Sequence, residues 1–271
     1  MAQRLATGAV LVVLGLVLIY FGGALMAITG IVFIGIALHE EYSALRKAKH
    51  QVTTWPTWLA LAVSVPLALL FGQKVVIPVL MAACLLTVSC VMFRKEPKLY
   101  DALVSVLPLF SILLPGLCII ALSLVQPLSV QRTLLGLLIA VPILGDTLAF
   151  FVGSKVRGPK LCPPVSPNKT ISGSVAGLVG SLLAALIVRA IAGWICAPTT
   201  QPILPSWPVC VFLGIFGGAA SQMGDLFASL VKRHCGIKDY SNLFPGHGGM
   251  LDRLDSILFM SVVLYCATML F

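Results

Sequence analysis

Long apolar runs, separated by short polar stretches, occupy most of the chain. Each run is close to the roughly 20 residues that a helix needs to cross the hydrocarbon core of a membrane. Only helices are expected for such runs, because a helix satisfies its own backbone hydrogen bonds. The pattern predicts an all-α polytopic membrane protein with about nine transmembrane helices. Their expected extents are 5–22, 24–39, 57–72, 75–93, 102–124, 133–153, 173–193, 208–231 and 255–271.

The composition agrees with this interpretation. Of the 271 residues, 59% are hydrophobic and only 10% are charged, whereas a soluble domain carries about 25% charged residues. A chain with so little polar surface must face lipid over most of its length. The eight cysteines include no Cys-x-x-Cys pair. We therefore interpret them as small buried hydrophobes rather than as disulfides or zinc ligands.

The net charge of +9 is concentrated in loops that would lie on one side of the membrane. If the N-terminus is cytoplasmic, only Lys74, Arg132 and Arg189 of the 18 basic residues fall on the opposite side. The positive-inside rule therefore predicts a cytoplasmic N-terminus and an external C-terminus. We expect a bacterial cytoplasmic (inner) membrane, since the short chain shows no targeting extension. We expect no nucleic-acid partner, because there is no basic tail or basic stripe with interleaved aromatic residues.

The two halves of the chain differ in their loops. Residues 154–172 and 232–254 are dense in glycine, proline and charge, whereas the first half contains no comparable segment. Such residues mark irregular backbone, and loops on a rigid scaffold often carry the chemistry of a protein. We therefore predict scaffold helices over 1–131 and a catalytic region over 132–271, with its active site at the cytoplasmic ends of the helices.

Four of the nine acidic residues lie inside apolar runs or at their ends: Asp146, Asp225, Asp252 and Asp255. Ionisable groups at membrane depth are costly and usually face a water-filled site or a partner. For any one of them, a structural ion pair with arginine or lysine is the alternative. Asp252 and Asp255 lie three residues apart at a helix start, which suits Mg²⁺ but also suits the positive end of the helix dipole. Taken together with Asp225, the pair favours a metal.

A polar stripe continues from Asp225 toward the end of its helix. Ser229, Lys232 and Arg233 follow Asp225 at helical spacing, so all four side chains share one face. The stripe leads from a carboxylate inside the membrane to two cations at the cytoplasmic mouth. Snorkelling toward the membrane surface explains the two cations as well, but it does not explain Asp225.

Two short segments are predicted to contact anions. Residues 245–249, Pro-Gly-His-Gly-Gly, form a turn whose glycines let backbone N–H groups approach a phosphate closely. His247 has no second histidine or cysteine at zinc-ligand spacing, so we interpret it as a donor to a phosphate or a carboxylate. Residues 166–170, Ser-Pro-Asn-Lys-Thr, place a cation and hydroxyls at a helix N-terminus. A capped helix start with a solvated Lys169 is the alternative for that segment.

The segment 229–255, SLVKRHCGIKDYSNLFPGHGGMLDRLD, resembles the signature of CDP-diacylglycerol synthases, also called phosphatidate cytidylyltransferases. That signature reads S-x-x-K-R, K-D, P-x-H-G-G and D-R-x-D. The matching positions are Ser229, Lys232, Arg233, Lys238, Asp239, Pro245, His247, Gly248, Gly249, Asp252, Arg253 and Asp255. Gly145-Asp146-Thr147 and residues 166–170 also resemble the family. Ser172 stands where members often carry glutamate.

The resemblance implies a reaction in which CTP and phosphatidic acid give CDP-diacylglycerol and pyrophosphate. It also implies Mg²⁺, a polytopic helical fold among membrane lipids and, commonly, a homodimer. The implied catalytic residues are Asp225, Asp252, Lys232 and Arg233. The metal ligands are Asp225 and Asp252, with Asp255 and Asp146 as candidates for a second cation or a supporting role. The implied substrate-binding residues are Ser166, Lys169, Thr170, Ser229, Lys238, Asp239, His247, Gly248, Gly249 and Arg253.

Two other functions would also use charged residues in a helical membrane protein. A CTP-dependent lipid kinase would phosphorylate an alcohol and release CDP, and the match to the synthase signature argues against it. A cation-coupled transporter would use buried aspartates near the middle of the membrane, whereas these aspartates cluster toward one face beside a glycine-rich loop.

Overall fold

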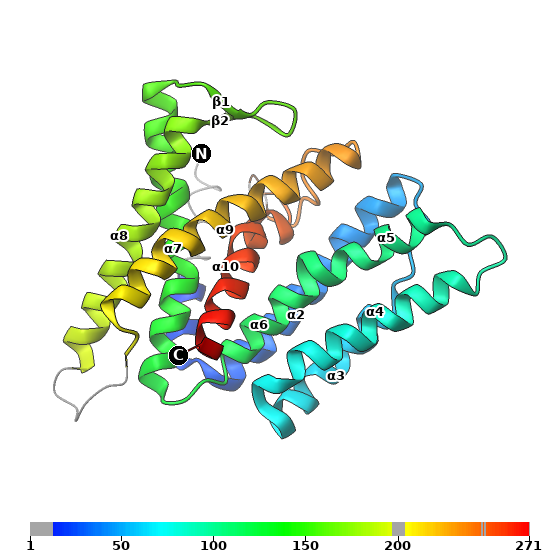
Figure 1. Ribbon diagram of the computed structural model, residues 1–271, viewed down its shortest axis with the longest axis horizontal. Coiled ribbons are helices and arrows are strands. Elements are labelled where there is room, and N and C mark those ends of the chain that lie inside the picture. Colours follow the sequence, from blue (N-terminus) through cyan, green and yellow to red (C-terminus); the bar gives the residue numbers. More distant parts are fainter. Residues whose placement is uncertain (1–12, 197–203, 245, 247, 271) are drawn as a thin grey trace. The chain divides into compact units, whose positions relative to one another are not determined.

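The computed structural model describes residues 13–196, 204–244, 246 and 248–270 (Figure 1). The structure is built from helices that follow one another along the chain. The helices are α2 (Gly23–Lys47), α3 (Trp55–Phe71), α4 (Val76–Met92), α5 (Leu99–Pro108), α6 (Leu114–Leu122), α7 (Leu128–Val156), α8 (Ile171–Cys196), α9 (Trp207–His234) and α10 (Leu251–Leu270). Residues 13–21 are also helical. The short elements are the 3₁₀ turn η1 (Gly72–Val75), the π-helical turn η2 (Leu109–Leu113), and the strands β1 (Lys160–Cys162) and β2 (Ser166–Thr170).

The prediction of a helical multi-pass membrane protein is confirmed. Within the described ranges, six helical segments are long and apolar enough to cross a membrane. They are Gly23–Lys47, Leu99–Leu122, Leu128–Val156, Ile171–Ile195, Trp207–His234 and Leu251–Leu270. Two further apolar helices, α3 and α4, are shorter. Part of the first predicted span, 5–12, lies outside the described residues. Helices α2, α7, α8 and α9 extend beyond the predicted spans at both ends, because hydropathy marks only their apolar part, whereas polar residues continue the same helix. Helix α4 is slightly shorter than its predicted span 75–93.

The contacts divide the chain into two units that do not follow chain order. Unit 1 contains Gly23–Leu124 and Val231–Leu254, and unit 2 contains Val13–Gly22, Val125–Leu230 and Asp255–Phe271. The end of α9, the start of α10 and the loop between them therefore belong with α2 to α6. The site residues are therefore described separately for unit 1 and for unit 2.

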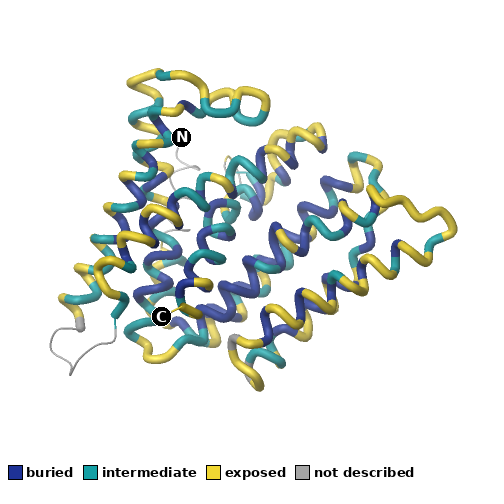
Figure 2. The backbone as a smooth tube through the Cα atoms, viewed as in Figure 1, coloured by how far each residue is buried: buried dark blue, intermediate teal, exposed yellow. Residues whose placement is uncertain are grey.

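The core of unit 1 lies along α2 and the segment from η2 to α6. Figure 2 shows α6 as a buried helix, and every residue from Pro115 to Leu122 is buried. Gly116 allows the closest approach, since a Cβ added there would lie 2.6 Å from Cδ1 of Ile34 on α2. Inside this apolar core, Ser111 of η2 donates a hydrogen bond of 2.9 Å to Oε2 of Glu41. π-helical turns occur often at functional positions.

Unit 2 is held together by small residues at helix crossings. A Cβ at Gly180 of α8 would lie 2.8 Å from the carbonyl oxygen of Leu144 on α7, and a Cβ at Gly214 of α9 would lie 2.8 Å from Cα of Leu182 on α8. Helices in membranes approach closely through such residues, because lipid supplies no hydrophobic force between them. Further glycines at these crossings are Gly145, Gly153, Gly173, Gly177 and Gly218.

The predicted loop 154–172 contains a β-hairpin that the sequence analysis did not anticipate. After α7 the backbone turns at Arg157, in a left-handed conformation with φ 46°. Strands β1 and β2 then pair antiparallel, Lys160 opposite Thr170 and Cys162 opposite Ser166. Thr170 Oγ1 accepts a hydrogen bond of 3.1 Å from the N–H of Gly173 and so caps the start of α8. These strands, of three and five residues, are too short for an alternating pattern to reveal them.

We expect Gly180→Ala to destabilise unit 2, because its new methyl group would meet a backbone oxygen that cannot move alone. The loss in free energy of unfolding should be about 1–3 kcal/mol, as for other overpacked positions. Gly30→Ala is the matched control, since its Cβ would meet only Ile120 Cγ1 at 3.9 Å, an ordinary contact. Denaturation of both variants in mixed micelles measures the difference, and equal stabilities would contradict this account of the crossing.

Candidate functional site

The loop between α9 and α10, in unit 1, is shaped by glycines. Gly246 and Gly248 have φ of +77° and +82°, a conformation that only glycine adopts at little cost. The N–H of Phe244 donates to the carbonyl of Gly248 over 2.9 Å and closes the turn. The glycine-rich turn predicted from the sequence is therefore confirmed as an irregular backbone. Pro245 and His247 lie outside the described residues.

Asp252, in the first turn of α10, accepts hydrogen bonds from this loop. Its Oδ1 accepts a hydrogen bond of 2.7 Å from Nζ of Lys232, and its Oδ2 accepts hydrogen bonds of 2.9 Å from the N–H groups of Tyr240 and Gly249. The side chain of Asp252 is only 4% exposed and that of Lys232 11% exposed. A buried carboxylate needs this complete set of partners. Lys232 therefore turns inward to an ion pair and does not snorkel.

Glu40 was not among the residues selected from the sequence. It lies on α2, and its Oε1 accepts hydrogen bonds from the N–H of Met250 at 3.0 Å and from Oγ of Ser241 at 2.5 Å. Its Oε2 accepts a hydrogen bond of 2.8 Å from the N–H of Leu251. The available signal was its position: Glu40 and Glu41 directly follow the predicted span 24–39. The helix continues through them to Lys47, so both carboxylates belong to a largely apolar helix.

In unit 2, Asp225 forms an ion pair with Lys169. The distance from Nζ to Oδ2 is 2.6 Å, and the side chains are 27% and 29% exposed. Lys169 is positioned by β2, one residue before the cap of α8. Ser229, one helical turn after Asp225, donates a long hydrogen bond of 3.4 Å to Oδ1 of Asp225. The two predicted segments around Lys169 and Asp225 are thus brought together.

Gly224 explains how α9 and α10 meet beside Asp225. A Cβ on Gly224 would lie 2.4 Å from the carbonyl oxygen of Asp255, so only glycine permits this approach. The next residue on α10, Ser256, makes a long contact of 3.5 Å from its hydroxyl to Oδ2 of Asp146 on α7. The backbone N–H of Ser256 also donates to Oδ1 of Asp255 over 2.7 Å. Three helices of unit 2 thus bring Asp146, Asp225 and Asp255 to one region.

These carboxylates do not form a complete metal-binding site by themselves. Among the described residues, no three histidine, cysteine or acidic side chains are grouped so that they could hold a metal ion. Mg²⁺ commonly takes only one or two carboxylates and completes its shell with substrate phosphates and water. Asp225 suits that role, because its side chain is 29% exposed and its lysine partner is 27% exposed, so a substrate-bound cation can reach the carboxylate. Asp252 suits it less, since its side chain is only 4% exposed and three donors already surround its carboxylate.

The remaining predicted residues of unit 1 differ in exposure. Lys238, Asp239 and Arg253 are exposed, so their charges are accessible to a polar ligand. The guanidinium of Arg233 is exposed as well, and its Nη1 donates to the carbonyl of Ile237 over 3.4 Å.

Burial raises the pKa of the neighbouring Cys235 thiol, and the charge of Glu41 raises it further. Cys235 therefore stays a neutral thiol and is a poor nucleophile.

Comparisons with known proteins agree on one family. The profile of the Cytidylyltransferase family matches residues 2–271. The chain is 41% identical over 126 residues to the phosphatidate cytidylyltransferase of Bacillus subtilis (strain 168), covering 46% of this chain and 44% of that protein. It is 43% identical over 124 residues to that of Brucella abortus biovar 1, covering 44% and 41%. It is 32% identical over 120 residues to that of Thermotoga maritima, covering 44% and 43%. Each alignment spans less than half of the relative.

Replacing Gly248 should disturb Asp252 as well as the turn. An alanine Cβ there would lie 2.9 Å from Oδ2 of Asp252, at a positive φ. Gly236→Ala is the matched control, because Gly236 also has a positive φ but its Cβ would meet nothing within 4 Å. The control should lose about 1–2 kcal/mol for the left-handed backbone, and Gly248→Ala about 2 kcal/mol more for the disturbed hydrogen bonds. Unfolding in mixed micelles tests this, and equal losses would show that Asp252 does not depend on the turn.

Proposed function

Because the chain belongs to the cytidylyltransferase family, we propose that it joins CTP to phosphatidic acid and releases CDP-diacylglycerol and pyrophosphate. The relatives support this substrate pair, since each of the three is a phosphatidate cytidylyltransferase. The activity is a proposal for this chain, because the similar segments cover less than half of those proteins.

One observation carries the proposal. Each of the two aspartates assigned from the sequence as catalytic is paired with a lysine, Asp225 with Lys169 in unit 2 and Asp252 with Lys232 in unit 1. In a nucleotidyl transfer, two polyanionic substrates must come together. The reaction therefore needs well-placed positive charge beside the phosphates more than it needs a general base. Ion pairs of this kind keep lysines in place before the phosphates arrive.

The nucleophile of the proposed reaction also suits these residues. A phosphate monoester has a second pKa of about 6, so phosphatidate is largely dianionic at neutral pH and needs no proton removed. Neither oxygen of Asp252 is left without a hydrogen-bond donor, which supports a role other than general base. The phosphate oxygen then attacks the α-phosphorus of CTP, and the bond to pyrophosphate breaks.

We assign different tasks to the cations of the site. Lys238 and Arg253 are exposed, so we propose that they contact substrate phosphates and reduce their mutual repulsion. Lys169 is partly exposed and is proposed to do the same in unit 2. Lys232, which is buried against Asp252, is proposed mainly to hold the loop. Arg233, Ser166, Thr170, Ser229, Asp239, His247, Gly248 and Gly249 remain proposed contacts of the substrates or of the loop.

We propose Mg²⁺ as the cofactor, with Asp225 as its first ligand. Bound there, Mg²⁺ would neutralise negative charge on the phosphates of CTP. Asp146 and Asp255 are proposed as ligands of a second cation or as supporting residues. The side chain of Asp252 is only 4% exposed and already accepts three hydrogen bonds, so its contacts favour a role in ordering the loop.

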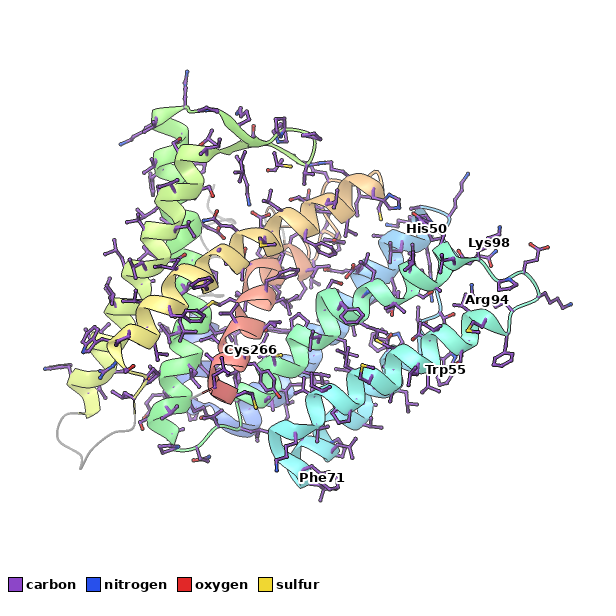
Figure 3. The ribbon with its side chains drawn as sticks, viewed as in Figure 1. His50, Trp55, Phe71, Arg94, Lys98 and Cys266 are labelled. Carbon is purple, nitrogen blue, oxygen red and sulfur yellow. The ribbon has the colours of Figure 1, made fainter. Side chains whose placement is uncertain are left out.

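The orientation of the chain and its assembly also remain proposals. In unit 1, His50, Arg94 and Lys98 lie at one end of the helices and Phe71 at the other (Figure 3). The positive-inside rule assigns the basic end to the cytoplasm. We therefore propose an active site that faces the cytoplasm of a bacterial cell, a cytoplasmic N-terminus and an external C-terminus. A homodimer is proposed from the family resemblance.

The direct test incubates the purified protein with phosphatidic acid, Mg²⁺ and CTP labelled in the base. We expect label to enter an organic-extractable lipid with equimolar pyrophosphate, and chelation of Mg²⁺ by EDTA to stop the reaction. CTP labelled in the γ-phosphate is the control, because a lipid kinase would transfer that label to an alcohol and release CDP. Transfer of the γ-label, or no labelled lipid from folded protein, would overturn the proposal.

Asp225→Asn should remove activity while the protein still folds. The amide keeps the size of the side chain but loses the charge that pairs with Lys169 and that we assign to Mg²⁺. We expect turnover to fall at least about 100-fold, as for the loss of a major electrostatic contributor. Glu96→Gln, an equivalent change at an exposed loop position, should keep full activity. Near wild-type turnover of Asp225→Asn, measured on monodisperse protein, would refute the assignment.

A further inference from the structure

Three consecutive N–H groups at the start of α10 point to carboxylates of the chain itself. Gly249 donates to Asp252, and Met250 and Leu251 both donate to Glu40. The glycine-rich turn was predicted from the sequence to offer its amides to a substrate phosphate. That turn covers residues 245–249, so only the amide of Gly249 belongs to it. It is used inside the protein, as are the amides of Met250 and Leu251 that follow the turn.

Glu40 contacts this loop at three points from a helix that is distant in sequence. Its two oxygens accept hydrogen bonds from Met250, Leu251 and the hydroxyl of Ser241. Ser241 lies 201 residues after Glu40 and Leu251 lies 211 residues after it. The hydroxyl of Ser241 in turn accepts a hydrogen bond of 3.2 Å from the N–H of Leu243. One carboxylate thus connects both ends of the loop to α2.

The fit around the carboxylate of Glu40 is tight. A Cβ added at Gly249 would lie 2.6 Å from Oε1 of Glu40, so the carboxylate lies directly against the glycine Cα. Glu40 is 5% exposed and Met250 is 4% exposed, so water cannot replace these hydrogen bonds easily. A buried negative charge at this position is favoured by the amides it accepts from and by the positive end of the α10 dipole.

We propose that Glu40 is a positioning residue. Its carboxylate is an internal anion that fills the anion site at the start of α10. It thereby sets the shape of the loop that carries Lys238 and of the first turn of α10, which carries Asp252 and Arg253. This inference rests on the proposed function, in which that loop serves the substrate phosphates. Phosphate recognition in unit 1 then falls to the exposed Lys238 and Arg253 rather than to the first amides of α10.

The alternative role for Glu40 is that of a temporary occupant, which would affect kcat and KM differently when it is removed. If its carboxylate only held the place of a substrate phosphate, that phosphate would displace it during each cycle. Removing Glu40 would then leave turnover intact and would lower the KM for CTP. If Glu40 is instead a permanent positioning residue, its removal lowers kcat because the loop loses its shape. An added small carboxylate can then occupy the space that the side chain of Glu40 leaves.

The experiment uses full-length Glu40→Ala in detergent and the labelled-CTP assay. We expect kcat to fall at least about tenfold and to recover severalfold in millimolar formate or acetate. Acetamide, which has the same shape as acetate but no charge, should restore nothing. Glu41→Ala is the matched control, because Glu41 is the next residue of α2 and accepts a hydrogen bond from Ser111 rather than from the loop. Its activity should not respond to acetate.

A second measurement does not depend on activity. Amide hydrogen exchange of a peptide covering residues 248–254 should be faster in Glu40→Ala and should slow again in acetate, since Met250 and Leu251 lose and regain their acceptor. Exchange in that peptide should be unchanged in Glu41→Ala. If the wild-type protein makes no CDP-diacylglycerol but the variants show this exchange pattern, the proposed reaction is wrong and the positioning role of Glu40 is still supported.

Glu40→Gln covers the case in which the alanine variant does not fold. The amide keeps the volume of the side chain but can accept through only one of its two terminal atoms, so exchange in residues 248–254 should still be faster than in wild type. The inference is overturned if Glu40→Gln, and Glu40→Ala where it folds, keep wild-type kcat and wild-type exchange in that peptide. A lower KM for CTP with unchanged kcat would also overturn it and would favour displacement by phosphate.

Discussion

A carboxylate in an apolar helical protein must find donors or a cation, because an uncompensated buried charge costs several kcal/mol. This constraint organises the loop between α9 and α10. Asp252 is satisfied by Lys232 and two amides, and Glu40 by two amides and a hydroxyl. Since almost every partner is a backbone group of the loop or the lysine that precedes it, satisfying the two carboxylates also folds the loop.

The same constraint acts differently in unit 2, where Asp225 is balanced by a side chain alone. Lys169 reaches it from the strand before α8, and both side chains stay partly exposed. An ion pair made by two flexible, partly exposed side chains is exchangeable, whereas amides of a closed turn are not. This contrast is the physical reason for proposing Asp225 as the metal ligand and an ordering role for Asp252. The glycines at the helix crossings, Gly224 above all, make the required close approach possible.

Much of this arrangement could be predicted from particular residues. The apolar runs predicted the helices and their order, and the spacing of Asp225 and Ser229 predicted the shared face on which Ser229 reaches the carboxylate. The hairpin around Lys169 could not be predicted, because its two short strands carry no alternating pattern. Glu40 was missed because it stands just beyond an apolar run, where an acidic residue ordinarily marks the end of a span.

The sequence by itself determined that this is a helical membrane protein of the cytidylyltransferase family, since apolar length and a local motif are properties of neighbouring residues. It also supplied the aspartates and lysines that we propose for the site. Only the tertiary structure decided which lysine pairs with which aspartate. It also decided that the N–H groups of Met250 and Leu251 donate to Glu40 and are not available to a ligand. These outcomes depend on contacts between residues 20 to 211 positions apart, and such contacts form only when helices pack.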